Sequence, residues 1–367
     1  MQTERLESVQ MLRAFAALLV TYGHVCSSTL KLSEKYGFDF PRLYQPTGIG
    51  VDLFFGISGF IMVYASERLF TRDGASIEFL SRRLIRIAPL YWLASLAFLL
   101  MLAVDAARGG QFPSARAIAE SLLFIPSMEF KPVHGFPYPI LAAGWTLNYE
   151  CFFYAVFAAF LFLRRERAVA AVAALLVAFV LLGAAIGPES TVLRFWTQPI
   201  VLEFALGMAV AIARRRQVML PSWLRVSMIV CAIAWVLAAP EVRSYGFERI
   251  AYWGLPAITV LAAVVLGRDP IPARFERPVA LLGDASYSLY LLHPLLIVAL
   301  QHSGLHPLGL TSAVTYIVVV VAASCLLAIV CSQRVERPLV KLLNAKAASL
   351  WRKPGGELAA AAAPPRR

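Results

Sequence analysis

The sequence predicts an all-α fold, a polytopic helical bundle in a membrane, with about ten transmembrane helices and both termini in the cytoplasm. Composition, a series of long apolar runs and an uneven distribution of basic residues lead to this prediction. Hydrophobic residues make up 59% of the 367 residues and charged residues 15%, and the mean hydropathy is +0.69. Average soluble domains are about 45–50% apolar and about 25% charged, so this composition excludes a disordered, fibrous or ordinary soluble chain.

Apolar runs of about 20 residues, the length that crosses a bilayer as a helix, recur along the chain. They lie near 11–29, 50–67, 88–106, 144–163, 168–187, 197–213, 222–239, 250–267, 282–301 and 312–332. A shorter run at 118–126 is expected to lie on the surface. We therefore expect a transmembrane domain over 1–345 and, because the end of the chain is rich in alanine and proline, a disordered cytoplasmic tail over 346–367.

The lysines and arginines give the expected orientation and explain a net charge of +12. If the first span enters from the cytoplasm, roughly three-quarters of the 34 basic residues fall on the cytoplasmic side, as the positive-inside rule requires. A similar surplus in a soluble protein would suggest nucleic acid. Because topology accounts for it here, the expected surroundings are a lipid bilayer, and no nucleic-acid partner is expected.

Ionisable residues inside spans are costly and usually face a cavity, so they are the first candidates for function. Arg13 and His24 both lie in the first span, eleven residues apart, which corresponds to a rise of about 16 Å and about three turns. Their side chains should therefore point the same way, with Arg13 at the cytoplasmic rim. Each residue alone is also typical of a structural role, Arg13 as an interfacial arginine and His24 as a polar group near a helix end.

The second span opens with GIGVDLFFGISGFIM, whose glycines and Ser58 favour close helix packing. Asp52 is expected near the level of His24, at the outer start of this span. Its carboxylate either stabilises the first helical turn through the helix dipole or orients and polarises His24. The sequence leaves both interpretations open.

The segment FLSRRLIRIAPLYW, after the second span, places three arginines on the cytoplasmic side at helical spacing: Arg82, Arg83 and Arg86. Guanidinium groups bind phosphate oxygens in pairs, so such a cluster suits a phosphate ligand. Topology alone explains two of these arginines, whereas three on one face favour a binding site.

Further polar residues lie in the later spans. Glu150 falls about one turn into the fourth span, where it either stabilises the helix dipole or serves a site on the outer side, and Glu203 lies inside an apolar run. Tyr287, Tyr290 and His293 are spaced to line one face of the ninth span. No cluster has the spacing of a metal site, so no metal is expected.

Taken together, these features resemble membrane acyltransferase family 3, and especially its exopolysaccharide O-acetyltransferase branch. The resemblance extends from MLRAFAALLV to RVERPL. Its motifs, in chain order, are R-x10-H (Arg13, His24), FFxxSG (Phe54, Phe55, Ser58, Gly59), RxxR (Arg83, Arg86), W-T-L-x-x-E (Trp145, Glu150) and SYSLYLLHP.

The resemblance implies an enzyme of the bacterial inner membrane that moves an acetyl group from cytosolic acetyl-CoA to a sugar hydroxyl. The implied acceptor is a surface or exported polysaccharide, or a lipid-linked oligosaccharide. Polysaccharide-assembly proteins are candidate partners. No metal is implied.

The resemblance also implies a role for each motif residue. The residues expected to hold the coenzyme phosphates are Arg13, Arg82, Arg83 and Arg86. His24 would act as a general base or a transient acyl carrier, oriented by Asp52 or Glu150. The residues expected to support the substrate or the structure are Ser58, Trp145, Glu203, Tyr287, Tyr290 and His293.

Two alternatives remain at this point. The buried arginine, histidine and glutamate residues could line the path of a transporter or flippase, although no repeated half with a broken helix is visible. An acyltransferase could also use a donor other than acetyl-CoA or a small-molecule acceptor. The sequence does not measure the acyl pocket.

Overall fold

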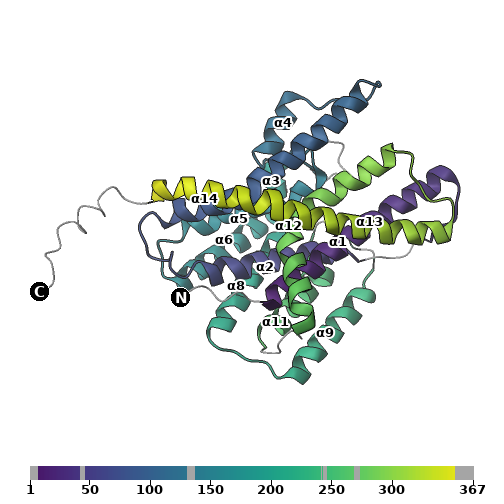
Figure 1. Ribbon diagram of the computed structural model, residues 1–367. Coiled ribbons are helices and arrows are strands. Elements are labelled where there is room, and N and C mark those ends of the chain that lie inside the picture. Colours follow the sequence, from purple (N-terminus) through teal and green to yellow (C-terminus); the bar gives the residue numbers. More distant parts are fainter. Residues whose placement is uncertain are drawn as a thin grey trace, which may run out of the picture.

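The computed structural model describes residues 7–41, 46–129, 137–240, 242, 246–267 and 273–351. Within these ranges the chain forms helices joined by loops, without a β-strand (Figure 1). The first helices are α1 (Glu7–Tyr36), α2 (Ile49–Ala65), α3 (Ala75–Ala106), α4 (Ala115–Leu122), α5 (Trp145–Ala159), α6 (Arg165–Ile186) and α7 (Thr191–Trp196). The others are α8 (Leu202–Arg215), α9 (Ser222–Leu237), α10 (Phe247–Arg249), α11 (Leu255–Val265), α12 (Ala273–His302), α13 (Leu310–Cys331) and α14 (Arg337–Trp351).

Four short turns interrupt or extend these helices. The 3₁₀ turns η2 (Ala142–Gly144) and η3 (Pro199–Val201) lead into α5 and α8. The π-helical turns η4 (Ile250–Gly254) and η5 (Ser332–Glu336) precede α11 and α14. Because π-helical turns often occur at functional sites, the residues beside η4 and η5 are of particular interest.

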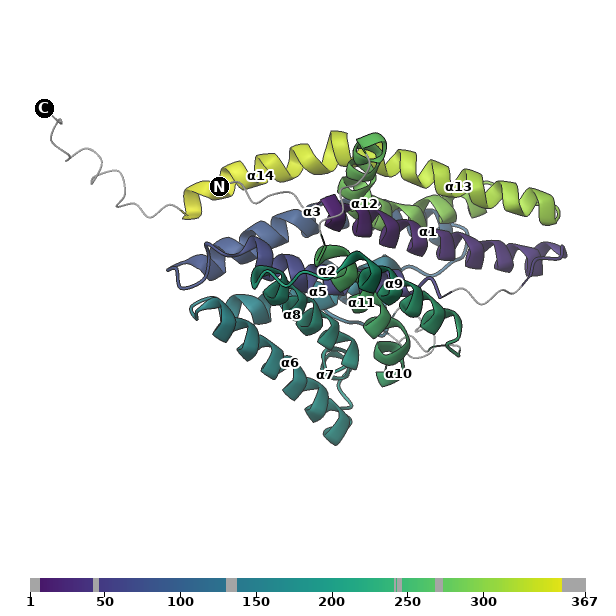
Figure 2. The same cartoon turned by 90° about the horizontal axis from the view of Figure 1, so that it is seen from below.

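Helix α2 lies at the centre of the bundle, packed against α1, α5, α8 and α11 (Figure 2). Its side chains Val51, Phe55 and Phe60 are buried in the main hydrophobic core. A Cβ atom on Gly207 of α8 would lie 2.0 Å from the carbonyl oxygen of Gly56, so α2 and α8 touch through their backbones. The glycines of α2 and α8 thus permit the close packing that the sequence predicts.

The outward faces of several peripheral helices are apolar. Exposed leucine, valine and tryptophan side chains cover α3, α6, α9 and α13, including Leu100, Leu181, Trp223 and Val318. In the described part of the chain, six helical stretches are long and apolar enough to cross a bilayer, and α2 and α9 are shorter apolar helices. Such surfaces are unfavourable in water and favourable in lipid. The chain is therefore a helical, multi-pass membrane protein, as the sequence predicts.

Four of the ten predicted spans, 50–67, 144–163, 197–213 and 222–239, correspond to helices of 14 to 17 residues, and the two shortest are α5 and α8. Helices α5 and α8 contain 15 and 14 residues. At about 1.5 Å per residue, each rises about 22 Å, less than the roughly 30 Å of hydrocarbon in a bilayer. The 3₁₀ turns before them set where these helices begin. The total of ten spans and the cytoplasmic location of both termini stay predictions.

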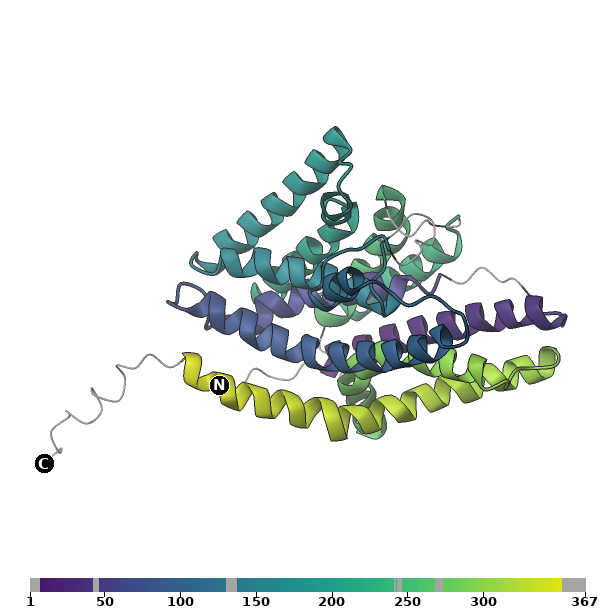
Figure 3. The same ribbon diagram turned by 90° about the horizontal axis from the view of Figure 1, so that it is seen from above.

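The segment with the three arginines is part of a helix. Helix α3 begins at Ala75, so Arg82, Arg83 and Arg86 lie about two to three turns after its start. At the other end of the chain, α13, η5 and α14 form one long, gently curved rod along a side of the bundle (Figure 3). Helix α14 continues beyond 346 to Trp351, and the remainder of the expected tail, 352–367, lies outside the described residues.

Candidate functional site

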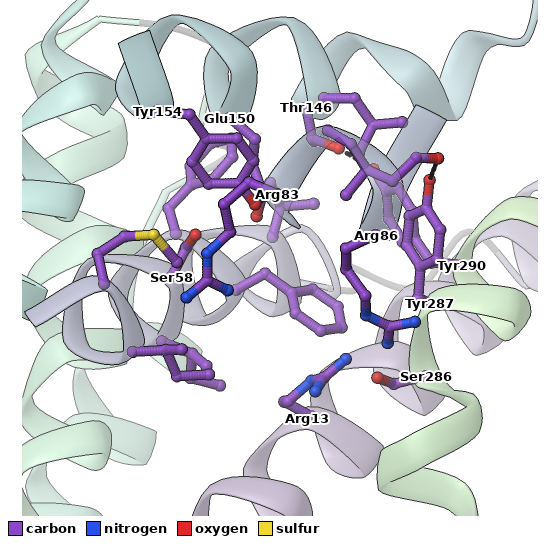
Figure 4. Close-up of a pocket in the computed structure, with 18 residues that line it drawn as sticks. Arg13, Ser58, Arg83, Arg86, Thr146, Glu150, Tyr154, Ser286, Tyr287 and Tyr290 are labelled. Atoms are coloured by element: carbon purple, nitrogen blue, oxygen red, sulfur yellow. Dashed lines mark hydrogen bonds between the residues drawn. The ribbon is translucent and has the colours of Figure 1, made fainter. Parts of the chain in front are cut away.

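A cavity of about 130 Å³ lies between α1, α2, α3, α5 and α12 (Figure 4). Its walls are largely apolar and aromatic, and its charged lining consists of Arg13, Arg83, Arg86 and Glu150. Binding sites for organic molecules are typically lined by apolar and aromatic side chains with a few converging polar groups. The lining thus carries three guanidinium groups and one carboxylate, a composition that suits an anionic ligand.

Helix geometry brings two of the arginines to one side of the cavity. Arg83 and Arg86 are three residues apart on α3 and therefore share a face, while Arg13 enters from α1 (Figure 4). The guanidinium group of Arg83 lies 5.5 Å from the ring centroid of Phe79, and that of Arg86 lies 5.5 Å from the ring centroid of Tyr287. Since like charges repel, converging guanidinium groups of this kind are stabilised by an anionic ligand.

Arg82 does not join the other two arginines of its segment. Its side chain is 55% exposed and forms an ion pair with Glu78, with an N–O distance of 2.7 Å. On the helix, Arg86 lies about 40° from Arg82 and about 60° from Arg83, so spacing alone does not separate Arg82, and its ion pair with Glu78 is what holds it away from the cavity. The expected convergence of three arginines therefore holds for Arg83 and Arg86 only, and Arg13 completes the group instead.

Glu336 fixes the position of Arg86. It is the last residue of η5, it is buried, and it forms an ion pair with Arg86. The hydroxyl of Ser288 donates a hydrogen bond to the same carboxylate. Sequence reasoning missed Glu336, although it lies in the RVERPL segment where the resemblance ends. Its signal is an acid directly after the last apolar run.

Glu150 faces the cavity from α5, about one turn after Trp145 (Figure 4). The hydroxyl of Tyr154 donates a hydrogen bond to its carboxylate, and Ser58 of α2 lines the cavity beside it. The structure thus places Glu150 with the arginines. No hydrogen bond or ion pair joins it to His24 in the described part of the chain, so orientation of His24 by Glu150 is not the observed arrangement.

A row of tyrosine and histidine side chains follows α12 away from the arginines. The hydroxyl of Tyr287 donates a hydrogen bond of 2.5 Å to the carbonyl oxygen of Ile87. The hydroxyl of Tyr290 accepts a hydrogen bond of 3.1 Å from the hydroxyl of Thr146. The ring centroids of Tyr290 and His293 are 6.2 Å apart.

His293 in turn contacts His24. The Nε2 atom of His293 is 2.7 Å from the Nδ1 atom of His24, and the planes of the two rings differ by 24°. His293 is fully buried, whereas His24 is exposed. The row of Tyr287, Tyr290 and His293 thus connects the cavity to His24, which does not itself line the cavity.

Asp52 occupies a different position from the one that an acid partner of His24 requires. Its side chain is fully buried, and its two carboxylate oxygens accept hydrogen bonds of 2.9 and 2.8 Å from Arg249. The guanidinium group of Arg249 lies 5.8 Å from the ring centroid of Trp145 and 5.0 Å from that of Trp253. Asp52 therefore belongs to a buried ion pair, and the expected orientation of His24 by Asp52 is not observed.

Arg249, which the sequence analysis did not single out, is the centre of this second cluster. It is the last residue of α10, directly before the π-helical turn η4, and ties α10 to α2 through Asp52. Glu203 of α8 lies next to Asp52 and packs against Gly254. Glu203, an ionisable residue within an apolar span, thus lies beside a buried guanidinium group.

These features define a class of protein. It is a multi-pass membrane protein with an internal cationic cavity, and the aromatic wall of that cavity ends at a pair of histidines. A cationic cavity suits a phosphate-bearing ligand, and an exposed imidazole suits proton transfer or nucleophilic attack. This combination is typical of an enzyme that transfers a group from a phosphorylated carrier.

Comparisons with known proteins agree with this class. The family described as acyltransferase domain, Acyl_transf_3, matches residues 6–332. The chain is also similar to the exopolysaccharide production protein ExoZ of Rhizobium meliloti (strain 1021), with 33% identity over 296 residues. That alignment covers 80% of this chain and 89% of ExoZ. No solved structure matches the chain.

The chain therefore belongs to acyltransferase family 3, in its exopolysaccharide branch. The resemblance seen in the sequence motifs is confirmed, and with it the assignment to a membrane acyltransferase.

Proposed function

We propose that this protein transfers an acetyl group from acetyl-CoA, taken from the cytoplasmic side of a bacterial inner membrane, to a sugar hydroxyl of an exported polysaccharide or its lipid-linked precursor. The observation that supports the proposal most is the cavity that carries Arg13, Arg83 and Arg86 and adjoins the two histidines through α12. The similarity to a protein of exopolysaccharide production supports a polysaccharide acceptor.

The cavity suits both parts of the proposed donor. Coenzyme A carries several phosphate groups and a long, uncharged pantetheine arm that ends in the thioester. The guanidinium groups of Arg13, Arg83 and Arg86 offer paired donors to phosphate oxygens. The apolar side chains Phe54 and Ile61 line the same cavity and offer a surface for the arm.

The row along α12 supports a direction for that arm. The arginines mark one end of the lining, and Tyr290 lies at the wall that is nearest to His293. An arm that enters between the arginines and passes Tyr287 and Tyr290 brings the thioester towards His24. A donor on one side of the membrane can thereby serve an acceptor on the other side, while the charged part of the coenzyme stays at the arginines.

His24 is the proposed general base. It accepts the proton of the acceptor hydroxyl while the hydroxyl oxygen attacks the thioester carbonyl. The carbon–sulfur bond then breaks, and the departing thiolate of CoA receives the proton from His24. The acetyl ester of the sugar and free CoA are the products, and no metal enters the reaction.

Neutralising the cavity arginines tests the donor site. Each hydrogen bond to a charged group contributes about 1.5–3 kcal/mol, so an Arg83→Gln/Arg86→Gln variant should bind CoA about 100-fold more weakly than the wild type. Calorimetry on protein in detergent measures this affinity. The matched control is Arg82→Gln, which removes the same charge from the same helix but outside the cavity and should bind CoA as the wild type does.

Two outcomes would contradict the proposal. Equal CoA affinity of the wild type, the double variant and the Arg82→Gln control would show that Arg83 and Arg86 do not bind CoA and only set the orientation of the protein in the membrane. Export of glycan without consumption of acetyl-CoA, measured in vesicles that contain the protein, would favour a transporter.

A further inference from the structure

The contact between His24 and His293 also determines hydrogen positions, because both ring nitrogens of His293 have a hydrogen-bond partner. His293 is fully buried on α12. Its Nδ1 atom lies 2.8 Å from the carbonyl oxygen of Leu289, one turn earlier on the same helix. Its Nε2 atom lies 2.7 Å from the Nδ1 atom of His24.

The carbonyl oxygen of Leu289 decides where the protons lie. A carbonyl oxygen can only accept, so the Nδ1 atom of His293 must carry a hydrogen and donate it. In a neutral imidazole the other nitrogen is then an acceptor, so Nε2 of His293 carries a lone pair and no hydrogen. The Nδ1 atom of His24 must therefore carry a hydrogen and donate it to that lone pair.

The opposite arrangements are unfavourable. If Nδ1 of His293 lacked its hydrogen, two lone pairs would face each other over 2.8 Å at Leu289. If His293 carried both hydrogens, it would be a buried cation whose hydrogen-bond partners are a carbonyl group and an imidazole, neither of them an anion. Burial of a cation without an anion is costly.

We infer that His293 is a positioning residue that holds His24 in the Nδ1–H form and so leaves the Nε2 lone pair of His24 as the base for the acceptor hydroxyl. The inference rests on the proposed role of His24 and deepens it. It assigns to a neutral imidazole the function that a carboxylate performs beside the histidine in many acid–base pairs.

The exposure of the two rings agrees with this assignment. His24 is exposed and His293 is not, so the ring with the free lone pair is the one that an acceptor can reach. When His24 takes the proton of the hydroxyl on Nε2, its Nδ1–H bond to His293 stays in place and stabilises the imidazolium. The Nδ1–H group of His293 stays hydrogen-bonded to the carbonyl oxygen of Leu289, so the proton is held on His24 until the thiolate receives it.

Nitrogen-15 NMR of the full-length protein in lipid bilayers tests the hydrogen positions without a measurement of activity. The chain has five histidines, and the His24 signals are those absent from a His24→Gln variant. We expect a protonated Nδ1 and an unprotonated Nε2 for His24 in the wild type. A protonated Nε2, the form that an imidazole prefers in water, would overturn the inference.

Two substitutions of His293 then test its consequence. His293→Leu removes both polar contacts, whereas the carboxamide of His293→Gln can accept from His24 and donate to Leu289. We expect the leucine variant to lose the Nδ1–H signature and to lower kcat about 10- to 100-fold at an unchanged KM for acetyl-CoA, and the glutamine variant to recover most of both. Thermal unfolding of each variant confirms that the protein is folded.

The failure of this inference differs from the failure of the proposed function. An unchanged kcat in a folded His293→Leu variant, together with an inactive His24→Ala variant, would refute the role of His293 while His24 remains the base. Transfer that persists in His24→Ala would refute the proposed function itself, whichever hydrogen positions the NMR spectra give.

Discussion

Replacing Arg249 by methionine should lower the free energy of unfolding by about 3–5 kcal/mol, because the substitution removes one partner of a buried ion pair and leaves the other uncompensated. Both oxygens of Asp52 accept hydrogen bonds from this guanidinium group, and the side chains of Asp52 and Arg249 are 0% and 4% exposed. Without Arg249, the carboxylate of Asp52 has lost both bonds in a site that water does not reach. Glu203 lies beside it and adds a second buried carboxyl group.

A second substitution should restore most of this loss. Replacing a buried ion pair by apolar side chains of similar volume is often neutral or stabilising by about 1–4 kcal/mol, so Asp52→Leu/Arg249→Met should be close to the wild type in stability. Asp52 lies in the pair with Arg249 and not beside His24 or in the cavity lining. We therefore also expect the double variant to retain acetyl transfer, although Asp52→Leu alone should lose stability as Arg249→Met does.

The assay is thermal unfolding in detergent for the wild type, the two single variants and the double variant, with the rate of acetyl transfer measured on the same preparations. A single Arg249→Met variant as stable as the wild type would refute the argument that the ion pair holds α2 to α10. A folded double variant without acetyl transfer would show that Asp52 acts in the reaction and would contradict its structural assignment.

The remaining predictions concern the position of one arginine and the packing of the core. Glu336→Gln removes the anionic partner of Arg86. In steady-state kinetics, the KM for acetyl-CoA should therefore change at least about 3-fold, while kcat stays within about 2-fold of the wild type. An unchanged KM would contradict the positioning role of Glu336. Gly207→Val should prevent folding, because its Cβ would lie 2.0 Å from the Gly56 carbonyl oxygen, whereas Gly309→Ala meets open space and should be tolerated. Yield of monodisperse protein from membranes distinguishes the two, and normal yield of Gly207→Val would contradict direct backbone contact of α2 and α8.

The helical, membrane-embedded class follows from the sequence because hydropathy and helix length depend on local composition alone. The exact beginnings of helices do not follow in the same way. Helix α3 begins at Ala75, well before the predicted span at 88–106, because a charged first turn can continue an apolar helix into the aqueous region. Helices α5 and α8 begin at 3₁₀ turns that no periodicity in the apolar pattern marks.

The candidate site was predictable where its residues share a helix. The spacing of Arg83 and Arg86, and that of Tyr287, Tyr290 and His293, gives their common faces directly. The same spacing does not exclude Arg82, which lies about 40° from Arg86 around the helix and is held away from the cavity by its ion pair with Glu78.

Partners on different helices were not predictable from the spacing of residues. His24 and His293 are 269 residues apart, Arg86 and Glu336 are 250 apart, and Asp52 and Arg249 are 197 apart. Each pair depends on how the helices pack, which a single sequence does not state. The expectation that Asp52 lies beside His24 came from their similar expected depth in the membrane, and depth alone does not determine which helix faces which.

The central claim is that His24 enables acetyl transfer from a donor held by the cavity arginines. The most direct measurement incubates lipid vesicles containing the wild-type protein or His24→Ala with acetyl-CoA labelled in the acetyl group and with an exopolysaccharide acceptor. The label that appears on the glycan is then counted at equal amounts of inserted protein. The account predicts labelled glycan with the wild type and a decrease of about 100-fold or more with His24→Ala. Equal labelling with both proteins would contradict it.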